Sequence, residues 1–250
     1  MRPEPRHAVA VVTGSAQGLG EAIAARFVQD GYRVVYADIN EDLNRQAAEA
    51  TDPSGEFVFP LRMNVQDLDS VEECLSAALG RWDRLDVWIN NAARTEARPF
   101  LDIDPAEWDD VLATNLRGTY FGCRVAGRHL CQQESGRIIN LASLAAQWGR
   151  SPTGVHYAAS KGGILALTRY AATAFASHGV TVNAIAPTAI EGPSVAKMPP
   201  EQVAAYASQI PVNRLGQPHE VAALASFLAS EDAGFITGAT YDINGGILMR

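Results

Sequence analysis

Short apolar runs alternate with longer amphipathic segments along the whole chain. Each apolar run is continuous and rich in β-branched residues, which is typical of strands buried on both faces of a sheet. We predict seven strands, at residues 8–12, 33–38, 57–63, 85–89, 136–141, 180–185 and 239–243. Helices are predicted between them, over about 21–30, 71–79, 105–130, 155–178 and 220–228. This alternation indicates an α/β fold in which helices cover both faces of a parallel sheet.

Neither an internal repeat nor a linker divides the chain, so we expect one domain over residues 1–250. A formal charge of -8 argues against nucleic acid or an anionic membrane as a partner. No apolar run approaches the ~20 residues of a membrane span, and the first residues lack a signal-peptide pattern. Three cysteines without a spacing pattern predict neither a disulfide framework nor a metal site. A cytoplasmic protein is the resulting expectation.

Candidate chemistry centres on Tyr157 and Lys161, which are four residues apart and share one face of the predicted helix. An ammonium group beside a phenol favours the phenolate and lowers the phenol pKa from about 10. Such a tyrosine can exchange protons near neutral pH. Ser143 lies where the strand at 136–141 runs into a loop, and its hydroxyl can hold a carbonyl or alcohol oxygen. Tyr157 is therefore predicted to act as a general acid and base.

A glycine-rich turn follows the first strand and opens the first helix, with Gly14, Gly18 and Gly20 in the spacing G-x-x-x-G-x-G. Such a turn lets the backbone approach a pyrophosphate at a helix N-terminus. Asp38 ends the second strand, where a carboxylate accepts hydrogen bonds from ribose hydroxyls and repels a 2′-phosphate. Gln17 leaves the turn without a basic residue. NAD is therefore favoured over NADP.

Taken together, these motifs resemble the short-chain dehydrogenase/reductase family in its single-domain form, over nearly the entire chain. The resemblance rests on the motifs above and on Asn90-Asn91-Ala92, Asn115, Asn183-x-x-x-Pro187 and Asn244-Gly245-Gly246, all in the family's order. It implies a Rossmann-type, doubly wound sheet. It also implies an oxidoreductase that interconverts a secondary alcohol and a ketone by hydride transfer to or from a nicotinamide cofactor.

Roles for single residues follow from the same resemblance. Lys161 would also bind the nicotinamide ribose, and Asn115 would hold a water molecule that links Lys161 to solvent. Asn90 would stabilise the sheet beside the cofactor. The implied cofactor-binding residues are Gly14, Gln17, Gly18, Leu19, Gly20, Asp38, Asn64, Val65, Asn91, Ala92, Tyr157, Lys161, Pro187, Thr188 and Ile190. The chain departs from the family pattern at Ala93, Thr188 and Gly192, which puts contacts to the adenosine and to the nicotinamide carboxamide in question.

The resemblance further implies a substrate lid over about residues 190–211 and a homotetramer, or a homodimer, formed through the long helices and the C-terminal strand. The lid is mostly small or apolar, so a small alcohol or ketone is expected as substrate. Two alternatives stay open. One is an NADPH-dependent enzyme like the 3-oxoacyl-(acyl-carrier-protein) reductases, and the other is a non-catalytic dinucleotide-binding sensor. Trp148 and His156 are candidates for substrate contact, and Arg94 and Arg98 belong to a solvated loop or meet an acidic substrate.

Overall fold

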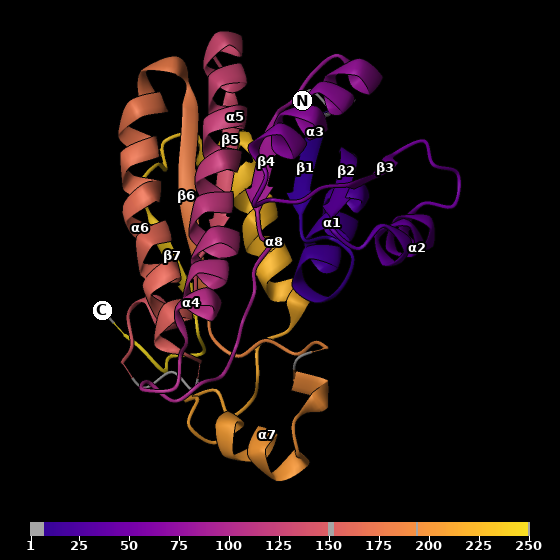
Figure 1. The fold of residues 1–250 in the computed structure, drawn as a ribbon. Coiled ribbons are helices and arrows are strands. Elements are labelled where there is room, and N and C mark those ends of the chain that lie inside the picture. The colour runs from indigo at the N-terminus through magenta and orange to yellow at the C-terminus, as the bar shows by residue number, and fades with distance from the viewer. Residues whose placement is uncertain (1–7, 150–152, 194, 250) are drawn as a thin grey trace.

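A single parallel sheet of seven strands forms the centre of the computed structural model, which describes residues 8–149, 153–193 and 195–249 (Figure 1). The strand order is β3-β2-β1-β4-β5-β6-β7, and every neighbouring pair is parallel. The strands are β1 (Val9–Thr13), β2 (Arg33–Asp38), β3 (Val58–Arg62), β4 (Val87–Asn90), β5 (Gly136–Leu141), β6 (Val180–Pro187) and β7 (Thr240–Ile243). The predicted Rossmann-type parallel sheet is thus confirmed.

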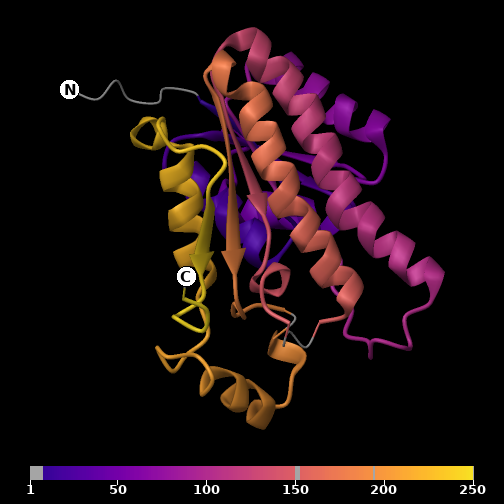
Figure 2. The ribbon, with the colours of Figure 1, turned by 90° about the vertical axis from the view of Figure 1, so that its left-hand side faces the viewer.

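Helices cover both faces of this sheet (Figure 2). They are α1 (Gly18–Gln29), α2 (Glu41–Thr51), α3 (Leu68–Trp82), α4 (Pro105–Leu112), α5 (Gly118–Gln133), α6 (Val155–Phe175), α7 (Pro200–Ala207) and α8 (Pro218–Ala229). One hydrophobic core lies under α1, α2 and α8, and a second lies under α3, α5 and α6. Successive residues of β1 serve the two cores in turn, since Ala10 and Val12 join the first and Val11 joins the second. This alternation explains why the strand reads as an unbroken apolar run.

Two elements differ from the sequence prediction. Helix α2 was not predicted because its composition is mostly polar, yet Asn40 caps it by accepting a hydrogen bond from Leu43 N at 3.1 Å. The long helix predicted over 105–130 is wrong as one regular helix. A π-helical turn, Ala113–Arg117, separates α4 from α5, and Asn115 lies buried in it. Such wide turns often occur at functional sites.

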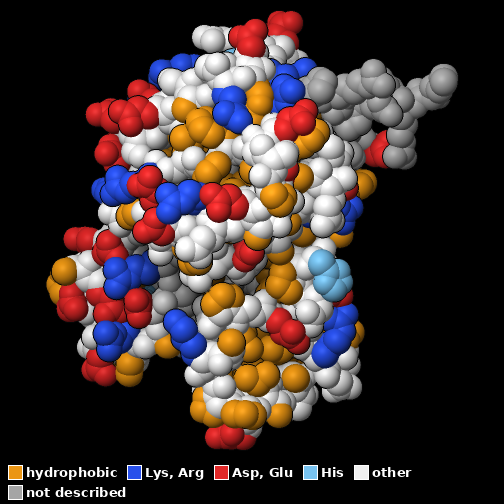
Figure 3. Space-filling model, turned by 90° about the vertical axis from the view of Figure 1, so that its right-hand side faces the viewer, with side chains coloured by type: hydrophobic (Ala, Val, Ile, Leu, Met, Phe, Trp, Pro, Cys, Tyr) orange, Lys and Arg blue, Asp and Glu red, His pale blue; other side chains and the backbone are white. Residues whose placement is uncertain are grey.

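From β1 the sheet is built outwards in one direction by β2 and β3 and in the other by β4 to β7, so the strand order reverses between the neighbours β1 and β4. In such sheets a crevice lies at the carboxyl ends of these two strands. Below this edge, α7 projects away from the sheet (Figures 1 and 2). The projection, residues 190–216, is closed at its base by a parallel bridge between Ile190 and Gly216. Figure 3 shows hydrophobic side chains gathered over it, and Met198 and Val212 are among the exposed ones. Within the described ranges, no helix combines the length and apolarity needed to cross a bilayer.

Candidate dinucleotide and catalytic site

A cavity of about 720 Å³ opens at the carboxyl ends of β1, β2 and β4. Most of the predicted cofactor residues line it, drawn from five separate stretches of the chain. They are Gly14, Gln17, Gly18, Leu19, Gly20, Asp38, Asn64, Val65, Asn91, Ala92 and Ile190. Tyr157, Lys161, Pro187 and Thr188 are not among the lining residues of this cavity. Residues that the sequence did not indicate, such as Ile39, Asn40 and Thr114, also line it.

The glycine turn needs its glycines for two reasons. Gly14 and Gly18 have φ of +69° and +61°, in the region that favours glycine. A Cβ on Gly20 would lie 2.0 Å from the carbonyl oxygen of Gly14, so no larger residue fits. Helix α1 begins at Gly18, and the side chain of its N-cap residue, Gln17, makes no capping bond. The first amides of α1 therefore lack a side-chain partner at the cavity wall, an arrangement suited to a pyrophosphate.

Asn44 on α2 supports this turn through hydrogen bonds, and no motif in the sequence indicates it. Its side chain is fully buried. Its oxygen accepts a hydrogen bond from Ser15 Oγ at 2.9 Å, and its nitrogen donates to the carbonyls of Tyr36 (2.7 Å) and Leu61 (3.2 Å). One amide thus joins the glycine turn to β2 and β3.

Asp38 faces the cavity from the end of β2. Its carboxylate accepts hydrogen bonds from the backbone N–H of Ala16 at 3.1 Å and of Asn40 at 2.9 Å. Both bonds orient the carboxylate beside the glycine turn. Arg94 is the one basic residue among the described residues that line the cavity, and its guanidinium is paired with Asp110 and Glu96.

Asn91 and Thr13 join the two central strands at the point where the crevice opens. Asn91 donates from its side chain to the carbonyls of Thr13 (2.9 Å) and Gly14 (3.0 Å). The Thr13 hydroxyl in turn accepts from the backbone N–H groups of Asn91 and Ala92, each at 3.0 Å. The Asn-Asn-Ala segment therefore fixes the relative position of the glycine turn and the end of β4.

Ser143 and Tyr157 come together beyond the end of β5. Ser143 begins a short 3-10 helix, Leu144–Ala146, and Tyr157 is the third residue of α6. Burial raises the pKa of Tyr157, whereas hydrogen bonding with the Ser143 and Thr95 side chains lowers it, and the net shift is upward. The sequence does not indicate Thr95, because this residue lies in a loop without a recognised motif.

Lys161 lies beside Tyr157 on one face of α6, as the spacing predicted. Its side chain is 2% exposed, and Nζ donates to the carbonyl of Leu141 at 2.6 Å. Nζ lies 5.6 Å from the centre of the Tyr157 ring. Burial lowers the pKa of Lys161 to about 7. In this structure the Ser143 and Thr95 side chains lower the pKa of Tyr157, and the expected effect of Lys161 on that pKa stays a prediction.

Asn115 lies in the π-helical turn, and its side chain makes three hydrogen bonds. Its side-chain oxygen accepts from Arg94 N at 2.7 Å, and its nitrogen donates to Arg94 O and to Ser160 Oγ, each at 3.0 Å. Its carbonyl accepts from the Thr119 hydroxyl at 2.7 Å. The Asn115 side chain thus holds the loop after β4 against α6.

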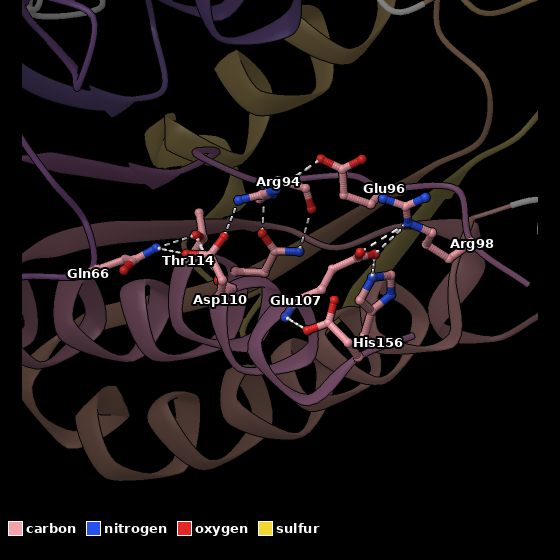
Figure 4. A network of polar contacts seen from close by, with 10 residues as sticks. Gln66, Arg94, Glu96, Arg98, Glu107, Asp110, Thr114 and His156 are labelled. Atoms are coloured by element: carbon pink, nitrogen blue, oxygen red, sulfur yellow. Dashed lines mark hydrogen bonds and ion pairs between the residues drawn. The ribbon is translucent and has the colours of Figure 1, made fainter. Parts of the chain in front are cut away.

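The loop after β4 is fastened by charged side chains as well (Figure 4). Arg94 pairs with Asp110 on α4, and Arg98 contacts Glu107 on the same helix, with Nε to Oε2 at 3.0 Å. Both side chains stay about half exposed, 48% for Arg94 and 53% for Arg98, which agrees with a solvated loop, and a contact with an acidic substrate stays a prediction. Glu107 also contacts His156, which is completely buried.

The remaining predicted residues lie at the ends of strands. Pro187 is buried at the end of β6, where it pairs with Ile243, and Thr188 N donates to Ile243 O at 3.2 Å. Asn90 is buried and bonds to Trp88 and Asn140, which agrees with a role in the sheet. Ala93 and Gly192 both line the cavity. Trp148 is partly buried in the loop between Ser143 and Tyr157.

A doubly wound sheet with a glycine turn, and with an acid ending the second strand, defines a dinucleotide-binding protein of the oxidoreductase class. The sequence model of a family described as "Enoyl-(Acyl carrier protein) reductase" matches residues 14–248. The chain belongs to the short-chain dehydrogenase/reductase family.

Relatives of similar length match it almost end to end. It is 34% identical over 242 residues to "3-oxoacyl-[acyl-carrier-protein] reductase FabG" of Thermotoga maritima, covering 96% of this chain and 98% of the relative. It is 36% identical over 244 residues to the protein of the same name from Staphylococcus aureus, with the same coverage. A solved structure, "Crystal structure of gox2181", superposes with a TM-score of 0.92 at 31% identity, covering 96% of this chain and 95% of that one.

Proposed function

We propose that this protein reduces the keto group of a 3-oxoacyl thioester, or of a closely related ketone, to a secondary alcohol, and that it also catalyses the reverse reaction. The observation that carries the proposal is the grouping of Tyr157 with the hydroxyls of Ser143 and Thr95 and with the buried amine of Lys161. The names of the relatives support the 3-oxoacyl thioester over an unspecified alcohol. Hydride is supplied by the nicotinamide dinucleotide that the cavity beside these residues suits.

The residues of the chain supply binding and proton transfer. Ser143 holds the carbonyl oxygen of the substrate, and Tyr157 gives that oxygen its proton as the alcohol forms. The bond to Ser143 favours the phenolate that remains, since hydrogen bonding to a charged form stabilises it. In the oxidative direction the same phenolate accepts the hydroxyl proton. Lys161, whose pKa lies at about 7, is able to exchange a proton at neutral pH.

We further propose NAD(H) as the preferred cofactor. The support is Asp38, whose carboxylate two backbone N–H groups hold at the cavity wall, because a carboxylate at the end of the second strand accepts from ribose hydroxyls and repels a 2′-phosphate. This preference differs from the NADPH use that the sequence resemblance associates with 3-oxoacyl reductases. A general NAD-dependent alcohol dehydrogenase is the second candidate, and Asp38 is the observation that favours it.

The proposal is tested by measuring cofactor binding first and substrate turnover second. Fluorescence titration with NADH and NADPH gives the two dissociation constants, and we expect NADH to bind more tightly by at least about tenfold. Asp38→Ala is expected to reduce or remove that ratio. Acetoacetyl-coenzyme A and a panel of simple ketones and secondary alcohols are then assayed with the preferred cofactor.

Tyr157→Phe should abolish turnover and leave NADH binding nearly unchanged. Tyr170→Phe is the matched control, because Tyr170 lies on the same helix and is 83% exposed. Activity on simple alcohols but not on the thioester would favour the second candidate. Binding without turnover over the whole panel would refute both and support a dinucleotide sensor.

We also propose that the protein forms a homotetramer, or a homodimer, through its long helices. Tyr120 on α5 is 48% exposed and Tyr170 on α6 is 83% exposed, which leaves apolar surface on these two helices. Light scattering of the purified protein measures the mass directly. A monomer at micromolar concentration would refute this assembly.

A further inference from the structure

His156 precedes Tyr157 in the first turn of α6 and is completely buried. Both of its ring nitrogens have partners. Nδ1 accepts a hydrogen bond from the backbone N–H of Tyr157 at 3.0 Å, and Nε2 lies 3.0 Å from Oε1 of Glu107. Because a backbone N–H donates to Nδ1, that nitrogen carries no proton. The ring proton therefore sits on Nε2 and is donated to the Glu107 carboxylate.

The ring takes the place of a helix cap. The N-cap residue of α6 is Gly154, which has no side chain, and the first amides of a helix need acceptors from outside it. Tyr157 is the third residue of the helix, and His156 Nδ1 accepts from its N–H. A Cβ on Gly154 would lie 2.2 Å from His156 Cε1 and 2.5 Å from Nδ1. Glycine is thus required at the N-cap because the histidine ring occupies the room of its side chain.

Glu107 is itself held from two sides (Figure 4). Asp104 caps α4 by accepting from Glu107 N at 2.9 Å, so the backbone of Glu107 is fixed. Arg98 Nε contacts its Oε2 at 3.0 Å. The exposed fractions of the side chains fall from 53% for Arg98 to 10% for Glu107 and 0% for His156. A chain of charged and polar contacts therefore runs from the surface to the backbone of the residue that we propose as the acid and base.

We propose that His156 is a positioning residue: its Nδ1 holds the backbone N–H of Tyr157 and thereby directs the phenol towards Ser143, while Glu107, held by Arg98, keeps the ring in the tautomer whose Nδ1 accepts. Arg98, Glu107 and His156 are called the positioning chain. This inference rests on the proposed function, because it assigns these residues a role in the reaction of Tyr157. None of them is a catalytic residue, since they act through the Tyr157 backbone. The role of the chain is orientation, and displacing a reacting group by about 1 Å can cost about a hundredfold in rate.

Two replacements of His156 separate its two contacts. In His156→Asn the amide oxygen takes the position of Nδ1, so the acceptor for Tyr157 N–H is kept and the contact with Glu107 is lost. In His156→Gln the amide nitrogen takes the position of Nε2, so the contact with Glu107 is kept and the acceptor is lost. We expect kcat to fall about 10- to 100-fold in His156→Gln, with KM and the NADH dissociation constant within about twofold of wild type. His156→Asn should retain most of kcat.

The N-cap residue of another helix, α3, provides the matched control. Asp67 caps α3 by accepting from Asp69 N at 3.1 Å, and it lies outside the cavity. Asp67→Ala should lower the melting temperature about as much as His156→Gln but leave kcat unchanged. If kcat falls equally in His156→Asn and His156→Gln, or in neither, the positioning role is refuted.

A measurement without substrate keeps this inference separate from the proposed function. Protein labelled with 3-fluorotyrosine gives a ¹⁹F signal for residue 157, assigned by its loss in Tyr157→Phe, and its pH titration reports the phenol directly. We expect His156→Gln to move the titration midpoint upward, because the phenol loses its alignment with Ser143, and His156→Asn to leave it near that of wild type. An upward shift in His156→Gln supports the positioning chain even if no substrate is turned over. An unchanged midpoint overturns it.

Discussion

The buried amide of Asn44 offers a quantitative test of how the glycine turn is supported. Asn44→Ala removes three hydrogen bonds, to Ser15, Tyr36 and Leu61, and leaves their polar atoms buried. At about 1 kcal/mol for each bond, we expect the free energy of unfolding to fall by about 3 kcal/mol. With a urea dependence of about 3 kcal/mol per molar, the unfolding midpoint should move down by about 1 M. Circular dichroism at one protein concentration measures it, so that any assembly equilibrium stays constant.

A double-mutant cycle isolates the contact with the turn. Ser15→Ala should cost about 1 kcal/mol in the wild type and close to nothing in Asn44→Ala, because the bond it would remove is already absent. The NADH dissociation constant should also rise in Asn44→Ala, since Ser15 belongs to the turn that lines the cavity. An equal cost of Ser15→Ala in both backgrounds would show that the 2.9 Å bond contributes nothing to stability, and the reasoning would be refuted.

Three further substitutions probe packing, charge and the phenol. Gly122→Ala places a Cβ 2.0 Å from Asn90 Oδ1, so we expect a loss of about 2 to 3 kcal/mol in the free energy of unfolding, measured by urea titration. Because burial lowers the pKa of Lys161 to about 7, the unfolded chain binds more protons than the folded one between about pH 7 and 10. The contribution of Lys161 to the free energy of unfolding should therefore rise with pH in that window, by at most about 1.4 kcal/mol per pH unit. Thermal unfolding measured at several pH values should show this rise in the wild type and not in Lys161→Met. Thr95→Val removes a hydroxyl that lowers the pKa of Tyr157, so kcat at neutral pH should fall about three- to tenfold, while Thr95→Ser should keep it. Equal rates for the two Thr95 variants would contradict this role.

The sheet could be predicted from the sequence because its strands are buried on both faces. The glycine turn could be predicted because its backbone conformation permits few residues other than glycine. Tyr157, Lys161 and Asp38 follow from spacing along single elements. Helix α2 escaped prediction because its buried residues are few and polar ones dominate.

Tertiary contacts explain the other misses. Thr95 and Asn44 owe their positions to partners far along the chain, and spacing carries no information about such contacts. The pKa of Lys161 is lowered by burial of its amine, and burial depends on residues far along the chain. The sequence offers His156 as a candidate for substrate contact, but its capping contact depends on the glycine two residues before it, and no periodicity indicates this.

The projection is anchored to the rest of the protein mainly at its base. The bridge between Ile190 and Gly216 closes it, and Ile210 is buried just before its return to the sheet. Between these anchors, α7 has no buried residue. Replacing residues 195–209 with the corresponding segment of a relative would therefore remove almost nothing from either core, and the cofactor cavity would keep its own lining. On the prediction that residues 190–211 form the substrate lid, substrate choice can change in this segment without a cost to folding, and the segment is a suitable graft point for redesign.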